Sequence, residues 1–554
     1  MTTLAPRGRA TSDAAVGWCL TLIVAVPFVV FLVVPLASIL VRGFETPDGL
    51  GLQNFTQTFG SARFWDLTVN SLAMAGLSTV IVVSLAYGYA YALQRTAVPL
   101  KPFLRIACLV PLFAPSLVQA QGLVLLLGRN GFLNRFLGFD IDIYGFWGVV
   151  IASSLYAFPY AFLILSAALA VADARIYDSA EALGAGPLRI FKDATLPATR
   201  FGLVSACFIA FTLVVTDFGN PIVIGGDFSV LATEMYNQVI GQAQFGLGAV
   251  IGIVLLVPAI VTKLLNNTLS GRTHAIITDG ARPLTIEPSP MRDLCWSLFV
   301  YGLVAVILSV PLIVLIASFT QLWPYNMAFS LRHYHFDVQN GLAPFKNSLI
   351  VSASAATIGV VLSTLAALVA NRFRTALSGP IGFLSILPSA VPGMVLGLGY
   401  LVTFNDPANP LGFLYGTLTL LVVMITYYNF ANAYLTASTS LGQIGKTFDE
   451  ASTMLGGSRL TTLFKITLPL LWPTMIGMWV FYFMRTMVTL SAIIFLITPS
   501  TQMASVSVLQ LSDRGAINQA AAFSICIMAV VVLCLALVRG LLILTGNRHV
   551  ALIR

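Results

Sequence analysis

The sequence predicts an all-α polytopic membrane protein with about 12 transmembrane helices, arranged as two parallel six-helix repeats. Hydrophobic residues make up 58% of the 554 positions and charged residues only 9%, with a mean hydropathy of +0.91. A soluble domain carries roughly a quarter charged residues, so water is not the main solvent of this chain. Apolar windows long enough to cross a bilayer recur along the whole length, and motifs of the first half return in the second.

The predicted spans are windows of about 20 or more mostly apolar residues. Six are expected in the first half, at 15–41, 68–93, 104–127, 144–172, 201–225 and 246–266. Six more are expected in the second half, at 295–320, 347–370, 379–403, 412–440, 470–497 and 519–545. The first window is too long for the core of a signal peptide, so we expect it to be retained as a span.

The distribution of basic residues predicts the topology. With the N-terminus placed inside, 21 lysines and arginines fall in the inner segments and 7 in the outer ones. The positive-inside rule then places both termini in the cytoplasm. The net charge of +8 reflects this topology, so the lipid bilayer is an expected partner and nucleic acid is not.

Internal repeats define the two halves. Two motifs recur at an offset of 277, namely Asn70-Ser71-Leu72 with Asn347-Ser348-Leu349, and the pair Pro111 and Pro115 with Pro388 and Pro392. A third, Thr195-Leu196-Pro197, returns as Thr467-Leu468-Pro469 at an offset of 272. We expect a first half at 1–266, a cytoplasmic linker at 267–294 and a second half at 295–554. Because six spans is an even number, both halves begin on the same side, which indicates a transporter with a central route between parallel repeats.

Each half carries a long cytoplasmic loop between its fourth and fifth spans. In the first loop (173–200), Asp178 precedes Gly184 by six residues, and Pro197 follows thirteen residues later. The second loop (441–469) has Glu450, Gly456 and Pro469 at the same spacings. An acid followed by small residues favours a short helix that another surface can approach closely, and glycine ends such a helix. Proline is well placed to open the next span, where its missing N–H is harmless.

These loops resemble the E-A-A-x-x-x-G signature, with its following Leu-Pro, of binding-protein-dependent ABC import permeases. The resemblance covers both halves and implies the type I ABC importer permease fold in a bacterial inner membrane. It also implies two copies of an ABC ATPase subunit, one per loop, and a periplasmic solute-binding protein. The first loop departs from the pattern because Asp178 stands in place of glutamate, which makes Glu181 a second candidate for the ATPase contact.

The chain itself is expected to catalyse nothing. The segment from Gly442 to Thr447 imitates a phosphate-binding loop, but that motif requires a glycine at the position of Ser440. We therefore expect no catalytic residue, no metal site and no bound cofactor, and ATP and Mg are used by the partner ATPase.

Five residues are candidates for the solute pathway, namely Thr216, Asp217, Asn220, Arg485 and Thr489. Ionisable residues inside spans are costly and often functional. Asp217 lies twenty residues after Pro197, near Gly219 and Pro221, which should interrupt the helix and free backbone groups to line a cavity. Two interpretations stay open for Asp217 and Arg485: contacts for a charged solute, or a structural ion pair or snorkelling arginine.

The segment from Thr216 to Gly226, continuing to Tyr236, resembles fused permeases for 2-aminoethylphosphonate. That resemblance implies 2-aminoethylphosphonate or a related phosphonate as the solute. Related fused permeases serve ferric iron, and more distant ones serve polyamines, thiamine or sulfate. A different class, an ion-coupled secondary transporter, would need intramembrane carboxylates, for which Asp217 is the clear candidate.

Overall fold

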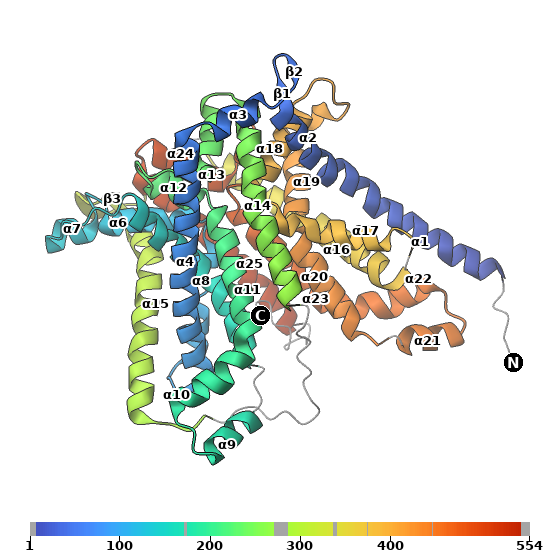
Figure 1. Ribbon diagram of the computed structural model, residues 1–554, viewed down its shortest axis with the longest axis horizontal. Helices are drawn as coiled ribbons and strands as arrows, with labels where there is room; N and C mark the ends of the chain where they lie inside the picture. The colour runs from blue at the N-terminus through green and yellow to red at the C-terminus, as the bar shows by residue number, and fades with distance from the viewer. Residues whose placement is uncertain are drawn as a thin grey trace.

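The computed structural model describes residues 7–170, 174–270, 286–335, 341–373, 375–445 and 447–544 (Figure 1). In this part of the chain, nine continuous helices are long and apolar enough to cross a membrane, and three bent helix pairs raise the number of spans to as many as twelve. The strands among these described residues form two short antiparallel hairpins. The predicted all-α membrane fold is thereby confirmed.

The first half contains α1 (Arg7–Phe28), α2 (Val34–Phe44), α3 (Gln53–Phe59), α4 (Ala62–Arg95), α5 (Lys101–Ala107), α6 (Leu117–Leu127), α7 (Phe132–Leu137), α8 (Phe146–Ala170), α9 (Ala174–Ala182), α10 (Pro187–Ile190), α11 (Leu196–Val215), α12 (Gly219–Ile224), α13 (Leu231–Tyr236) and α14 (Phe245–Ser270). Its hairpin is β1 (Glu45–Thr46) with β2 (Gly49–Leu50). Its 3₁₀ and π segments are η1 (Val29–Val33), η2 (Val110–Phe113), η3 (Phe191–Thr195) and η4 (Asn237–Gly241).

The second half contains α15 (Pro290–Ser318), α16 (Ala343–Leu368), α17 (Ser378–Ile386), α18 (Gly393–Phe404), α19 (Leu418–Tyr428), α20 (Phe430–Gln443), α21 (Thr447–Met454), α22 (Arg459–Thr462), α23 (Leu468–Val488), α24 (Ala504–Asp513) and α25 (Ile517–Leu544). Its hairpin is β3 (Thr320–Leu322) with β4 (Asn326–Phe329). Its 3₁₀ and π segments are η5 (Arg332–Tyr334), η6 (Val369–Phe373), η7 (Leu387–Ala390), η8 (Gly412–Leu414) and η9 (Leu463–Thr467).

The linker between the halves is described only at its ends. α14 runs to Ser270 and α15 begins at Pro290, whereas 271–285 lie outside the described residues. The predicted boundaries of the two halves and the linker therefore stay a prediction.

Two predicted spans are displaced by nine or more residues at both ends. The span expected at 201–225 is Pro187–Val215, and the span expected at 470–497 is Arg459–Val488. Both begin earlier because a π turn, η3 or η9, joins the loop helix to the span without a break. The first ends earlier because the carboxylate of Asp217 accepts a hydrogen bond from the amide of Gly219 at 3.1 Å and so starts a new short helix, α12.

The repeated prolines mark the bends of the third span in each half. The first bend turns the chain by 102° between Lys101–Phe113 and Leu117–Leu137, and the second by 110° between Ser378–Ala390 and Gly393–Phe404. Pro111 is the second residue of η2 and Pro388 the second residue of η7, and the second proline of each pair precedes the next helix. Proline removes a backbone donor and clashes with the preceding turn, which accounts for a sharp break. A third broken span, Leu418–Tyr428 with Phe430–Gln443, bends by 51°.

The first span of each half packs against the other half. In Figure 1 the blue helix α1 extends along α16 and α17 of the second half, and yellow-green α15 stands beside α4 and α6 of the first. Glycine permits the closest approach in each case. A Cβ on Gly122 would lie 2.9 Å from the carbonyl oxygen of Val310 in α15, and one on Gly399 would lie 2.6 Å from that of Pro35 in α2. Gly122 and Gly399 are 277 positions apart. Equivalent glycines of the two halves therefore contact the first span of the other half, an arrangement that we call the exchange of first spans.

The repeated Asn-Ser pair anchors a short helix in each half. The hydroxyl of Ser71 accepts the amide of Leu231 at the start of α13, and the hydroxyl of Ser348 accepts that of Ala504 at the start of α24, both at 2.8 Å. Asn70 and Asn347 donate their side-chain amides to carbonyls of the preceding loops at 3.0–3.1 Å. The first amides of a helix lack carbonyl acceptors within it, and α4 and α16 each supply an acceptor for one of them.

Candidate functional site

The first loop forms a short helix that ends at a glycine. Asp178 and Glu181 are exposed on α9, and Gly184 follows the helix with a φ of 74°. The amide of Ala185 donates to the carbonyl of Ala180 at 3.0 Å, which is the long closing bond of a Schellman cap. A side chain at Gly184 would strain this left-handed turn.

The second loop has the same geometry. Glu450 is exposed on α21, and Gly456 follows with a φ of 78°. The amide of Gly457 donates to the carbonyl of Ser452 at 2.8 Å, again closing the turn. Pro197 and Pro469 come just after the π turns η3 and η9, so each missing N–H coincides with an irregular turn of a continuous helix.

Apolar side chains project outward beside both glycines. Leu183 is 88% exposed, and its repeat counterpart Leu455 is 89% exposed next to Met454 at 91%. Single exposed leucines are ordinary on protein surfaces, but exposed apolar groups at matching positions of two repeats indicate an interaction surface. Figure 1 shows α9 and α21 toward the lower side of the view, away from the β1–β2 hairpin at its top.

A cavity of about 40 Å³ lies where the two halves meet, enough for a few water molecules. The first half lines it with Leu112, Ala114, Ser116, Tyr156, Tyr160, Leu213, Thr216 and Asp217, and the second with Tyr428, Arg485, Val488, Thr489, Leu490 and Ser491. Four of the five predicted pathway residues, namely Thr216, Asp217, Arg485 and Thr489, therefore line one cavity. The fifth, Asn220, lies behind Asp217 and is fully buried.

Asp217 is bound by several donors of its own half. Its two carboxylate oxygens accept the amide of Gly219 at 3.1 Å and the side-chain amide of Asn220 at 2.7 Å, and Ser116 contributes a further hydrogen bond. Asn220 in turn accepts the backbone amide of Ala120 at 3.1 Å. The carboxylate thus joins the start of α12 to α6, and much of its hydrogen-bonding capacity is used within the fold.

Arg485 crosses from the second half to the first. Its Nη1 donates to the hydroxyl of Tyr160, it also bonds Tyr156, and its guanidinium carbon lies 5.7 Å from the centre of the Tyr160 ring. No ion pair in the described part of the chain includes Arg485 or Asp217, although both line the same cavity. The guanidinium therefore faces the cavity with tyrosine hydroxyls, rather than a carboxylate, as its partners.

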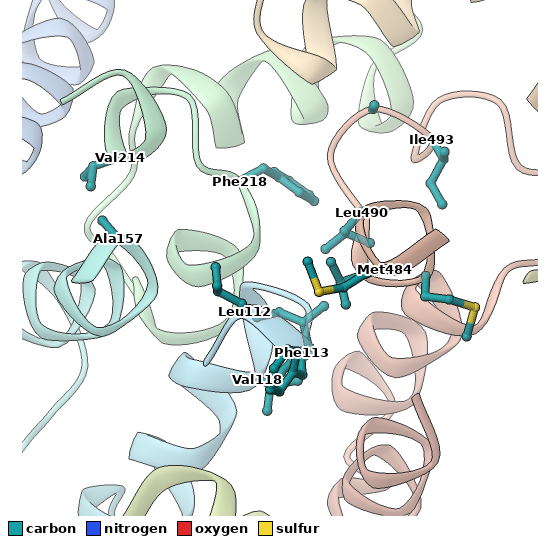
Figure 2. Close-up of a cluster of buried hydrophobic side chains, with 14 of the residues drawn as sticks. Leu112, Phe113, Val118, Ala157, Val214, Phe218, Met484, Leu490 and Ile493 are labelled. Carbon is teal, nitrogen blue, oxygen red and sulfur yellow. The ribbon is translucent and has the colours of Figure 1, made fainter. Parts of the chain in front are cut away.

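Figure 2 shows a cluster of buried apolar side chains, two of which also line this cavity. Leu112, Phe113 and Val118 come from the bent third span of the first half, and Met484 and Leu490 come from α23 and the turn after it. All five are less than 10% exposed. Leu112 and Leu490 also line the cavity, so its wall is continuous with the apolar packing between the halves.

A known protein family matches each half of the chain separately. A family model described as "Binding-protein-dependent transport system inner membrane component" matches the chain twice, at residues 92–274 and 359–544. Together the two matches cover well over half of the chain. The chain belongs to this family.

Relatives of the permease differ in their stated solute. A ferric transport system permease protein of Actinobacillus pleuropneumoniae is 28% identical over 531 residues, which cover 92% of this chain and 75% of the relative. A putative ferric transport system permease protein of Haemophilus influenzae is 30% identical over 491 residues, which cover 85% and 76%. A putative 2-aminoethylphosphonate transport system permease protein of Salmonella paratyphi A is 29% identical over 226 residues, 40% of this chain and 83% of the relative.

Family membership confirms the resemblance that the two loops carry. Each match contains one loop and the cavity residues of its half. The chain is therefore a fused pair of ABC importer permease halves, and the membership implies an ATPase and a periplasmic binding protein as partners. The alternative of an ion-coupled secondary transporter loses its support.

The tyrosines of the permease cavity were not among the predicted pathway residues. Tyr156 and Tyr160 are four residues apart on α8, so they share a face of that helix and both reach Arg485. That spacing of two hydroxyl-bearing side chains within an apolar span was a usable signal. Tyr428, at the bend between α19 and α20, had no comparable local pattern.

Proposed function

We propose that the permease forms the solute passage of an ABC importer and couples it to two copies of a separate ATPase, one at α9 and one at α21. The observation that carries this proposal is the pair of matching loops, each a short helix closed by a left-handed glycine and bordered by an exposed leucine. A periplasmic binding protein would deliver the solute at the opposite end of the bundle. Both termini would then lie in the cytoplasm, as the basic residues predict.

The proposed role needs no chemistry from this chain. Asp178 or Glu181 in the first loop and Glu450 in the second would meet the ATPase surface, and Pro197 and Pro469 would pass the displacement into α11 and α23. ATP and Mg would be bound by the ATPase alone. Asp178 is one methylene shorter than glutamate, so we expect the two contacts to be unequal.

Transport would require the halves to separate. A cavity of about 40 Å³ is too small for a solute of several heavy atoms. Leu112 of the first half and Leu490 of the second form part of its wall. Alternating access by rocking of two repeats opens such a closed central site first to one side and then to the other. Arg485 and Tyr160 belong to different halves, so their hydrogen bond would break on opening and leave the guanidinium for the solute.

The proposed solute is 2-aminoethylphosphonate or a related phosphonate. Arginine binds phosphonate-like oxyanions through its planar fork of donors, and Arg485 has no carboxylate partner in the described residues. The hydroxyls of Ser116, Thr489 and Ser491 would add weaker donors, and Asp217 lies in the same cavity for the ammonium group.

Ferric iron is the second candidate, because two relatives that match most of the chain are named for ferric transport. The cavity offers hard oxygen groups in Tyr156, Tyr160 and Asp217, which suit such a cation better than nitrogen or sulfur groups would. Arg485 would in that case favour a complex of iron with an anion over the bare ion.

Uptake in a strain that lacks its own phosphonate and ferric importers separates these candidates. The strain would express the permease with its ATPase and binding protein, and uptake of labelled 2-aminoethylphosphonate and of labelled ferric citrate would be compared. ATP-dependent uptake of the phosphonate alone supports the first candidate, and uptake of iron alone replaces it with the second. Uptake without any ATPase would refute the importer proposal itself.

A further inference from the structure

Two arginines at equivalent positions of the two halves donate hydrogen bonds to the end of the helix that leads into each loop. Arg95, the last residue of α4, donates from Nη2 to the carbonyl of Leu169 at 3.0 Å. Arg372, 277 positions later, donates from Nη2 to the carbonyls of Leu441 at 3.2 Å and Ile444 at 2.8 Å. Because the last carbonyls of a helix lack partners and carry partial negative charge, a guanidinium stabilises them.

The residue before each arginine also donates a hydrogen bond to the helix that leads into the loop. Gln94 donates to the hydroxyl of Ser166 at 3.1 Å, and Asn371 donates to that of Ser438 at 3.0 Å. Ser166 and Ser438 are 272 positions apart, as the two loops are. The second span of each half is thus fastened at two points to the helix that precedes the loop.

In the first half Arg95 also contacts the loop helix α9. The guanidinium carbon of Arg95 lies 4.7 Å from the centre of the Tyr177 ring on α9, and Nη2 donates to the Tyr177 hydroxyl at 3.3 Å. That hydroxyl donates to Thr195 at 3.1 Å, at the junction with α11. Arg95 and Tyr177 are both less than 10% exposed, in contrast to the exposed acids of the same helix.

In the second half the position equivalent to Tyr177 carries an acid. The position equivalent to Tyr177 is Asp449, so no aromatic ring is present there. Within the described residues, a 2.6 Å hydrogen bond between the hydroxyls of Ser452 and Thr462 joins α21 to α22. The corresponding residues of the first half, Ala180 and Ile190, cannot form that bond.

We propose that Arg95 and Tyr177 form the link through which displacement of α9 reaches the spans α4, α8 and α11. The inference rests on the proposed function and deepens it. Arg95 and Tyr177 are positioning residues: they touch neither solute nor nucleotide and act by joining α9 rigidly to three spans. Two buried groups that share a cation–π contact and a hydrogen bond move as one body, whereas a loop joined only by its backbone would bend.

The test compares transported solute per ATP hydrolysed in the complete importer, reconstituted in lipid vesicles with its ATPase and binding protein. The variants are Arg95→Gln, Arg95→Lys and Tyr177→Phe. The control is Arg105→Gln, because Arg105 is an exposed arginine on α5, outside both loops. We expect every variant to retain the ATPase subunits and to hydrolyse ATP, with solute per ATP reduced about tenfold in Arg95→Gln, a size typical of coupling between sites.

Tyr177→Phe keeps the ring over the guanidinium and removes only the hydroxyl, so we expect a smaller loss, and the control should match the native ratio. A native ratio in both Arg95→Gln and Tyr177→Phe would overturn the link. If Arg95→Gln does not assemble, Tyr177→Phe decides alone: a reduced ratio supports the link and a native ratio overturns it. Failure of the native chain to retain any ATPase would instead refute the proposed function, and the link with it.

Discussion

Truncation of the exposed leucine in each loop should weaken ATPase binding without destabilising the permease. Leu183 and Leu455 are 88% and 89% exposed, so neither side chain contributes appreciable burial to the fold. If docking buries them, Leu→Ala removes the equivalent of two to three methylenes, or roughly 2 kcal/mol at about 0.8 kcal/mol each. A free-energy loss of that size raises the dissociation constant about 30-fold at each loop.

The assay is a titration of permease in lipid nanodiscs with purified ATPase subunit, together with a thermal unfolding scan of each variant. The matched control is Leu50→Ala, because Leu50 is 79% exposed but lies in the β1–β2 hairpin at the other end of the bundle. Native affinity in the Leu183→Ala/Leu455→Ala double variant would refute the docking argument. An equal loss of affinity in Leu50→Ala would show that the effect is not specific to the loops.

Three further predictions concern the exchange of first spans, the anchored short helices and the cavity. Gly399→Ala should lower the unfolding temperature, because its Cβ would lie 2.6 Å from the carbonyl oxygen of Pro35 and overpacking costs about 1–3 kcal/mol. Ser71→Ala should lower it as well, by the equivalent of about 1 kcal/mol, because the amide of Leu231 loses its acceptor. Arg485→Gln should leave ATPase binding intact and reduce uptake about tenfold, as expected for loss of one charged hydrogen-bond donor.

Each of these predictions has a control in the same chain. Gly76→Ala places its Cβ in open space within α4, where alanine favours the helix more than glycine does, so it should not lower the unfolding temperature. Ser38→Ala removes an exposed hydroxyl that bonds only within its own helix, so it should be neutral. Arg485→Lys keeps the charge without the planar fork and should recover part of the uptake. Equal unfolding temperatures for Gly399→Ala and Gly76→Ala, or full uptake by Arg485→Gln, would contradict the reasoning.

The sequence by itself determined the features that depend on local pattern. Hydropathy located the spans, because crossing a bilayer requires an apolar window of fixed length wherever it occurs. The repeat was readable because Asn70 with Asn347, and Pro115 with Pro392, occupy equal places in two halves that fold alike. The loops around Gly184 and Gly456 were readable because a left-handed turn at a helix end selects glycine within a few residues.

Only the tertiary structure decided which distant residues meet. Arg485 and Tyr160 are 325 positions apart, and no periodicity within either span encodes their contact. The end of the fifth span was misplaced because the hydrogen bonds of Asp217 redirect the chain within an otherwise apolar window. The exchange of first spans was equally hidden, since Gly399 reveals its role only when Pro35 packs against it. The local sequence pattern predicts whether a segment lies in lipid or water and where it turns. The partners of a buried group depend on how all the segments pack together.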